Sequence, residues 1–146
     1  MSLSMTKSQR EAFVAAVRVA IISVAEPGKG PLTVPVWYRY EPGGDIFFST
    51  GARSKKAELI RKAGRLSLCV QTETAPYQYV SVEGPVTLAE PEFDRDTRQV
   101  AYRYLGEQMG DMYLQMTAAE RAEMPSVLVR LKPERWITVD YNKMMA

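Results

Sequence analysis

The 146-residue chain contains no histidine, and this absence excludes several kinds of chemistry at once. Neither a Ser-His-Asp triad nor a Cys-His pair can form. A metal site built on imidazole ligands is impossible, so we expect no bound metal. No pair of carboxylates stands out as a general acid and base. If the protein is an enzyme, we therefore expect a cofactor to supply the reactive group, while the protein provides position and electrostatics.

Cysteine, long apolar segments and net charge are scarce as well. The single cysteine, Cys69, permits neither an internal disulfide nor a zinc cluster, and its apolar neighbours predict a buried side chain. No apolar run approaches the ~20 residues of a membrane span, and the first residues are polar, unlike a signal peptide. A net charge of +2 is too small to indicate a nucleic-acid binder. We expect a cytoplasmic protein whose partners include no nucleic acid and no membrane.

What the chain does contain is a series of short strand-like segments separated by turn residues. There are about seven, at residues 19–24, 32–40, 46–49, 66–71, 77–88, 127–131 and 136–139. A helix is predicted from Ser54 to Gly64, and others after Pro91 and behind capping boxes at Ser8 and Thr117. Short spacings and antiparallel turn signals predict one domain, residues 1–146, that folds as a small, mainly β (α+β) barrel with helical additions.

The segment from Ser49 to Leu59 carries the clearest functional signal. A strand-like run ends in a Ser-Thr-Gly turn, and the helix that follows has Arg53, Lys55 and Lys56 at its start. These cations oppose the helix dipole, which places roughly +0.5 of an elementary charge at the N-terminus. An anion would resolve the conflict, because free N–H groups, hydroxyls and converging cations together form a phosphate site. A solvated basic helix start is the alternative interpretation.

Four segments in a fixed order resemble a known family. They are Val-Pro-Val-Trp-Tyr at residues 34–38, Ser-Thr-Gly-Ala-Arg-Ser-Lys-Lys at 49–56, Arg-Leu-Ser-Leu at 65–68 and Val-Ser-Val-Glu-Gly at 80–84. Together they are similar to the pyridoxamine 5′-phosphate oxidase-like, FMN-binding split β-barrel superfamily, over nearly the whole chain. The resemblance implies a six- to seven-stranded antiparallel split β-barrel with flanking helices, which forms a homodimer and holds its cofactor at the subunit interface.

The resemblance also implies which residues bind the cofactor, in three groups: around its phosphate, along its ring and elsewhere in the pocket. The residues are Ser49, Thr50, Arg53, Ser54, Lys55 and Lys56 around the phosphate, Val34, Pro35, Val36 and Trp37 along the ring, and Tyr79 and Trp136 elsewhere in the pocket. Trp37 and Tyr38 are neighbours on a predicted strand and face opposite sides, so at most one of them can line the pocket.

The chain also differs from a true pyridoxamine phosphate oxidase. Thr33 and Tyr38 stand where those oxidases carry an arginine and a lysine, and their C-terminal arginine-histidine substrate motif is absent. The chain looks more like the branch of small reductases that use FMN or a deazaflavin. The function implied is hydride transfer from such a cofactor to a small conjugated or aromatic acceptor, with Tyr77, Tyr79 or water as proton donor. The alternative is a non-catalytic flavin or haem-type binding or carrier module on the same barrel.

The choice between the two cofactors depends on the cations available. FMN carries a terminal phosphate dianion, whereas the deazaflavin carries a phosphodiester and an acidic tail. The two missing cations favour the deazaflavin, and Arg61, Lys62 and Arg65 follow in or just after the same predicted helix, where they could meet an acidic tail.

Overall fold

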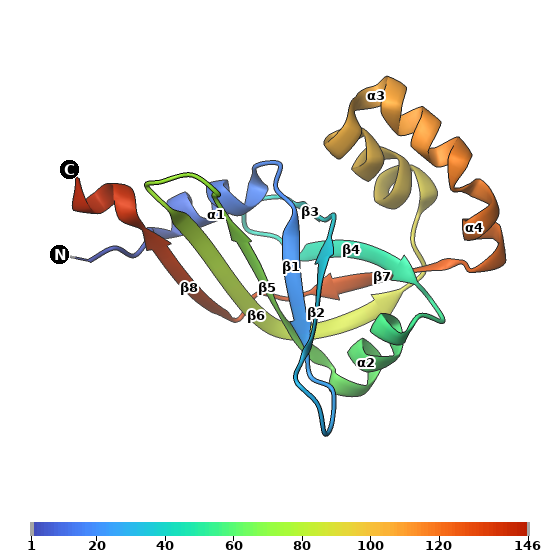
Figure 1. The fold of residues 1–146 in the computed structure, drawn as a ribbon, viewed down its shortest axis with the longest axis horizontal. Helices are drawn as coiled ribbons and strands as arrows, with labels where there is room; N and C mark the ends of the chain where they lie inside the picture. The colour runs from blue at the N-terminus through green and yellow to red at the C-terminus, as the bar shows by residue number, and fades with distance from the viewer. Residues whose placement is uncertain (1, 146) are drawn as a thin grey trace.

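The computed structural model describes residues 2–145, which fold into a curved antiparallel sheet with helices around it (Figure 1). The strands are β1 (Ala20–Val24), β2 (Leu32–Val36), β3 (Arg39–Tyr40), β4 (Ile46–Gly51), β5 (Arg65–Gln71), β6 (Gln78–Ala89), β7 (Ser126–Leu131) and β8 (Arg135–Asp140). The helices are α1 (Lys7–Ala15), α2 (Lys55–Ala63), α3 (Gln99–Met116) and α4 (Ala118–Glu123), with a π-helical segment η1 (Phe93–Arg98) and a 3₁₀ turn η2 (Tyr141–Met144). This architecture confirms the predicted mainly β split barrel with flanking helices.

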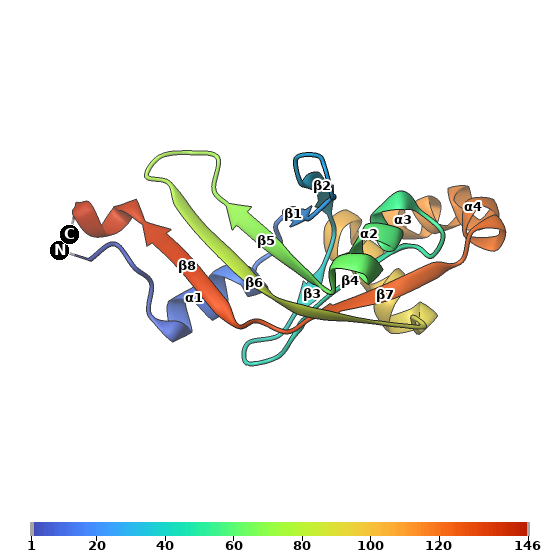
Figure 2. The same cartoon turned by 90° about the horizontal axis from the view of Figure 1, so that it is seen from below.

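Strand β6 joins the two halves of the sheet. The strand order is β2-β1-β5-β6-β7-β4-β3, and β8 also pairs with β6. The first residues of β6 pair with β5 on one side and with β8 on the other, whereas residues 86–89 pair with β7. The strand therefore runs from one half of the barrel into the other, and Figure 2 shows it as a long curved ribbon.

Two residues of chain connect the opposite ends of this sheet. β2 and β3 are the outermost strands, yet only Trp37 and Tyr38 separate them in the sequence, so one predicted strand is two strands in the structure. Tyr38 points into the core, where its hydroxyl donates to the Val14 carbonyl at 2.6 Å and burial raises its pKa to about 12. Trp37 lies on the opposite side and lines a cavity, as its alternation with Tyr38 predicts.

Helix α2 has the two ends that the sequence predicts. The Ser54 hydroxyl accepts the Ala57 N–H at 3.1 Å, and Gly64 ends the helix with a φ of 69°, which glycine adopts without strain. Leu59 and Ile60 bury their side chains in the core. Because this apolar face fixes the rotation of the helix, consecutive residues of its first turn project in different directions.

Helix α4 begins after Thr117 as the sequence predicts, but both predicted capping boxes are wrong. The N-cap of α1 is Thr6, whose hydroxyl accepts the Gln9 N–H while the Gln9 side chain accepts the Thr6 N–H, so the capping box lies two residues before Ser8. Thr117 forms no capping box, because its hydroxyl donates to the Tyr113 carbonyl one turn back.

The helices η1, α3 and α4 stand together beside β4 and β7 (Figure 1). The helical structure predicted after Pro91 extends to Met116 and is broken at Gly106, where φ is 80°. The two halves of α3 pack so closely that a β-carbon on Gly110 would lie 2.6 Å from the Tyr102 ring. We call residues 93–123 the helical hairpin; it covers one side of the candidate site.

Candidate functional site

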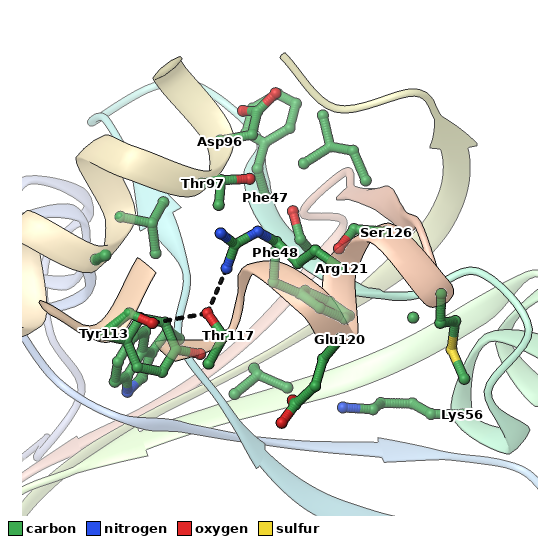
Figure 3. Close-up of a pocket in the computed structure, with 18 of the residues that line it drawn as sticks. Phe47, Phe48, Lys56, Asp96, Thr97, Tyr113, Thr117, Glu120, Arg121 and Ser126 are labelled. Atoms are coloured by element: carbon green, nitrogen blue, oxygen red, sulfur yellow. Dashed lines mark hydrogen bonds between the residues drawn. The ribbon is translucent and has the colours of Figure 1, made fainter. Parts of the chain in front are cut away.

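A cavity of about 980 Å³ lies between the barrel and the helical hairpin, and Figure 3 shows its lining. Strands β2, β4 and β7 form one wall, α2 contributes one end, and the helical hairpin forms the opposite wall. Six of the twelve predicted site residues line it, namely Pro35, Val36, Trp37, Ser49, Arg53 and Lys56. The cavity therefore brings together the strand segment and the basic turn that the sequence placed at one site.

At the α2 end of the cavity, two polar groups have no partner within residues 2–145. The Ser49 hydroxyl oxygen is buried and makes no hydrogen bond. The Lys56 side chain is half-buried, burial lowers its pKa, and no carboxylate forms an ion pair with it among residues 2–145. Buried polar groups without partners are costly. An anion bound to both groups would remove that cost.

Arg53 and Gly51 complete this end of the cavity. The Arg53 guanidinium donates from Nη2 to the Glu123 carbonyl at 2.7 Å, which ties the start of α2 to the end of α4. Gly51 has no side chain, and a β-carbon there would overlap the Met124 sulfur. This end of the cavity therefore leaves backbone atoms accessible to a ligand, with the cations Arg53 and Lys56 beside them.

Lys55 lies outside the cavity. Its ammonium group forms an ion pair with Glu26 in the β1–β2 turn at 2.9 Å, and 62% of its side chain is exposed. The hydrogen bond raises the pKa of Lys55 and lowers that of Glu26. The two neighbouring lysines of α2 therefore differ, because one is paired at the surface and the other is unpaired in the cavity.

Three more of the predicted residues support the site without lining it. Thr50 is buried on the inner face of β4, and Val34 packs against the core. The Ser54 hydroxyl caps α2 and also donates to the Gly51 carbonyl at 2.7 Å, so its hydrogen-bonding capacity is used locally.

The structure does not bring Tyr79 or Trp136 to this cavity. Tyr79 lies in β6, opposite Val139 of β8, and Tyr77 lies just before that strand. Trp136 packs against the core, with the Arg10 guanidinium 4.5 Å from the centre of its ring. In a single chain, as described over residues 2–145, none of these three residues lines the cavity.

An aromatic cluster that the sequence did not predict forms one side of the cavity. Trp37 stacks on Tyr104 with ring centres 5.0 Å apart and meets Tyr113 at 5.3 Å with a 51° tilt. The Tyr104 hydroxyl donates to the Arg18 carbonyl at 2.7 Å and accepts the Tyr38 N–H at 3.1 Å. These contacts hold Trp37 between the barrel and the helical hairpin. The two tyrosines are far from Trp37 in the sequence, so no local pattern identifies them.

Asp96 fixes the start of the helical hairpin to the barrel. Its carboxylate is buried and accepts hydrogen bonds from Arg39 Nε at 3.0 Å, from Arg95 at 3.1 Å and from the Glu92 N–H at 2.8 Å, and it forms an ion pair with Arg39 Nη2 at 2.9 Å. Burial alone would raise the pKa of Asp96, but these donors more than offset it and hold the pKa below its ordinary value. In the sequence Asp96 is one of several charged residues in a run, and nothing distinguishes it.

The wall formed by α4 carries charges of both signs. Arg121 donates from Nη2 to the Leu114 carbonyl at 2.7 Å and from Nη1 to the Thr117 hydroxyl, while Glu120 and Glu123 also line the cavity. In total, four cationic and three acidic side chains line it, and Arg39 and Asp96 neutralise one another. The net charge of the lining is therefore only slightly positive.

Metal and membrane features are absent from the described part of the chain. Among residues 2–145, no three acidic, cysteine or histidine side chains gather closely enough to hold a metal ion. Over the same residues, no helix combines the length and the apolar character needed to cross a bilayer.

Comparisons with known proteins identify relatives of this fold. Residues 6–140 match the family described as Pyridoxamine 5'-phosphate oxidase. The conserved hypothetical protein Rv2991 from Mycobacterium tuberculosis is 25% identical, with a TM-score of 0.78 over 99% of this chain and 90% of that one. A FAD-binding protein from Mesorhizobium loti is 19% identical, with a TM-score of 0.62 over 92% and 93% of the two chains. An F420 reductase is 16% identical, with a TM-score of 0.58 over 87% and 94%. No curated protein matches the chain.

Proposed function

Because the chain belongs to the pyridoxamine 5′-phosphate oxidase family, we propose that its cavity binds a phosphorylated flavin-type cofactor. One observation carries the proposal: the buried Ser49 hydroxyl and the half-buried Lys56 ammonium group line one end of a large cavity and have no partner within residues 2–145. Ligand cavities usually measure about 300–1,000 Å³, so the space suits a cofactor. Phosphate oxygens would accept hydrogen bonds from both groups and from Arg53.

The ring of the cofactor belongs along the free edge of β2. This strand lies at one end of the strand order, so one of its edges pairs with no other strand among residues 2–145, and an edge strand tolerates a proline such as Pro35. Pro35, Val36 and Trp37 line the cavity next to that edge. In this arrangement four predicted residues lie next to the site without contacting the cofactor, namely Val34, Thr50, Ser54 and Lys55.

The cations available favour a deazaflavin over FMN. Lys56 and Arg53 are the cations at the α2 end, Lys55 is neutralised by Glu26, and Glu120 and Glu123 also line the cavity. A phosphodiester monoanion needs less compensation than a phosphate dianion, so this end suits the deazaflavin. Two similar structures are a FAD-binding protein and an F420 reductase, and F420 is a deazaflavin. FMN is the second candidate.

We propose that the protein is an oxidoreductase that acts on a small conjugated or aromatic acceptor. A bound reduced flavin or deazaflavin supplies hydride. The chain contributes aromatic side chains to the lining of the cavity, Trp37 from the barrel and Tyr113 from the helical hairpin. Water remains available as the proton donor, since neither Tyr77 nor Tyr79 lines the cavity.

We also propose that two copies of the chain pair through the outer face of the sheet. Ile21, Cys69, Ser81 and Ile137 form one row across β1, β5, β6 and β8. Ile21 and Ile137 are 40% and 45% exposed, and Cys69 is half-exposed rather than buried as the sequence predicts, because it points outward from β5. An uncharged row of this kind can pack on itself across a two-fold axis. Tyr79 lies on the same face, where a second copy could bring it to the neighbouring cavity.

A pair of neighbouring substitutions tests the cofactor site. We expect Lys56→Gln to weaken binding of the deazaflavin coenzyme about tenfold or more, because a hydrogen bond to a charged group contributes about 1.5–3 kcal/mol. Lys55→Gln, one residue earlier in the same helical turn, should change the affinity less than about twofold, because Lys55 interacts with Glu26 at the surface. Fluorescence titration of both variants measures the effect. Equal losses in the two variants would refute this placement of the phosphate.

Direct competition decides between the two cofactors. The deazaflavin tail is longer and more acidic, so its binding should fall more steeply as salt rises from low to moderate concentration. Arg65 is already paired with Glu83 and Glu134, which leaves Arg61 and Lys62 to interact with the tail. Tighter binding of FMN, with a shallower salt dependence for the deazaflavin, would identify an FMN protein instead.

A further inference from the structure

Besides Lys56 and Arg53 at the α2 end, the cavity contains a third cation that no carboxylate among residues 2–145 neutralises. Arg121 forms no ion pair among residues 2–145, and neither does Lys56. Figure 3 shows the two groups pointing in different directions: the Lys56 chain extends toward Glu120, whereas the Arg121 guanidinium points toward Thr117 and Tyr113. One anion on Lys56 would therefore leave Arg121 without a partner.

Two hydrogen bonds hold the Arg121 guanidinium in place and leave its other N–H groups available to a ligand. Its guanidinium carries five N–H groups, and the Leu114 carbonyl and the Thr117 hydroxyl use one donor on each terminal nitrogen. These two anchors lie at the end of α3, so they fix the plane of the guanidinium relative to the helical hairpin. A planar, oriented guanidinium with free donors matches a carboxylate, which it can bind through two parallel hydrogen bonds.

The surroundings of the two cations differ in chemical character. Lys56 shares its end of the cavity with the small residues Ser49 and Gly51. Arg121 points toward Tyr113, which meets Trp37 in the aromatic cluster. Small polar residues suit a phosphate, whereas aromatic side chains suit a flat apolar body that stacks on them. The cavity volume of about 980 Å³ is at the upper end of the range of about 300–1,000 Å³ for ligand sites, so an acceptor can bind beside part of a cofactor.

We infer that Arg121 binds the carboxylate of the acceptor, so that the substrates of this protein are planar aromatic or conjugated acids. This inference rests on the proposed function, because it names the substrate class of the proposed cofactor site. It assigns Arg121 to substrate selection and leaves Lys56 for the phosphate of the cofactor.

Two probes of equal size and different charge test the inference without the cofactor. 2-Naphthoate and 2-naphthamide are titrated into Trp136→Phe protein, so that quenching of Trp37 reports binding in the cavity. We expect naphthoate to bind about tenfold more tightly or better, as one charge-assisted pair provides. The preference should disappear in Arg121→Gln and persist in part in Arg121→Lys. Arg98→Gln is the matched control and should keep the preference, because Arg98 is paired with Asp94 and does not line the cavity.

Two results would overturn the assignment of Arg121. One is equal binding of the two probes by the Trp136→Phe protein; the other is a preference that Lys56→Gln removes and Arg121→Gln retains. If Arg121→Gln and Arg121→Lys both unfold, the NMR signal of the Arg121 Nε–H decides: naphthoate must shift it and naphthamide must not. A protein that discriminates the probes through Arg121 but binds neither cofactor would refute the proposed function and leave the anion site in place.

Discussion

Asp96 shows at the scale of one residue how the helical hairpin is attached. Its carboxylate is fully buried, yet it stays charged because Arg39, Arg95 and a backbone N–H all donate to it. Arg39 also stacks on Phe47 of β4, at 4.0 Å from the ring centre. The pair therefore connects η1 to the barrel wall of the cavity, and its loss should affect both the stability and the shape of the site.

We predict that Asp96→Asn lowers the free energy of unfolding by about 3–5 kcal/mol at neutral pH, because removing one member of a buried pair leaves the other without compensation. Asp94→Asn is the matched control. Asp94 forms an exposed pair with Arg98, and such pairs contribute about 0–1 kcal/mol. Urea unfolding of the two variants and the natural protein at pH 7 measures both values; similar losses in the two variants would contradict the role given to Asp96.

The same residue predicts a pH dependence. Because the folded protein lowers the pKa of Asp96, its contribution to stability is complete above the unfolded pKa of about 3.9 and is lost as the pH falls through the lower folded value. The difference in stability between the natural protein and Asp96→Asn should therefore shrink below about pH 4. A difference that stays constant from pH 7 to pH 3 would exclude this explanation.

The two lysines of α2 show what the sequence could and could not predict about single residues. The sequence shows the cations at the start of the helix, and these cations predict a phosphate site. Which of them enters the cavity depends on the rotation of α2, set by Leu59 and Ile60, and on Glu26, which lies in a distant turn and pairs with Lys55. Side chains that come together through the fold, such as Arg121 and Tyr113, left no local pattern.

At the scale of the elements, Gly84 explains why β6 can pass from one half of the barrel to the other. The turn between β7 and β8 crosses directly over it: the Lys132 N–H donates to the Pro85 carbonyl and the Glu134 N–H to the Glu83 carbonyl, both at 3.0 Å. A β-carbon on Gly84 would overlap the Lys132 carbonyl oxygen. The position therefore requires glycine because of this close backbone approach, although its φ is ordinary.

We predict that Gly84→Ala destabilises the protein by about 3 kcal/mol, at the upper end of the cost of overpacking, because a backbone carbonyl cannot turn aside as a side chain can. Gly30→Ala is the control, since no atom lies within 4 Å of its β-carbon position. Thermal unfolding followed by circular dichroism compares the two. If the two variants unfold at the same temperature, the close approach of the Lys132 carbonyl does not require glycine at position 84.

Elements whose ends are set locally were predictable, and those set by distant contacts were not. The Ser54 cap and the Gly64 end of α2 are in the structure where the sequence places them. At the break between β2 and β3 the Tyr38 N–H donates to the hydroxyl of the distant Tyr104, a contact that no pattern in residues 32–40 indicates. The second half of α3 depends on Gly106, where the chain reverses so that Gly110 packs on Tyr102.

At the scale of the whole molecule, we predict a homodimer in which the outer sheet face is covered. The thiol of Cys69 lies in the centre of that face, so its reaction with a thiol reagent should slow as the protein concentration rises and dimers form. Ile137→Asp should weaken the dimer and restore fast modification, because a charge would be buried in the interface. Sedimentation that shows a monomer at micromolar concentration, with cofactor still bound, would contradict the interface and any role of Tyr79 or Trp136 at a neighbouring site.

The most direct test of the cofactor site asks whether the phosphate and Lys56 act together. The deazaflavin coenzyme and its phosphate-free riboside are each titrated into the natural protein and Lys56→Gln, which gives four dissociation constants. We expect loss of the phosphate tail to weaken binding to the natural protein about tenfold or more, and to weaken binding to Lys56→Gln severalfold less, because only Ser49 and Arg53 then contact the phosphate. An equal loss in both proteins would mean that the phosphate does not contact Lys56, and would contradict the proposed site.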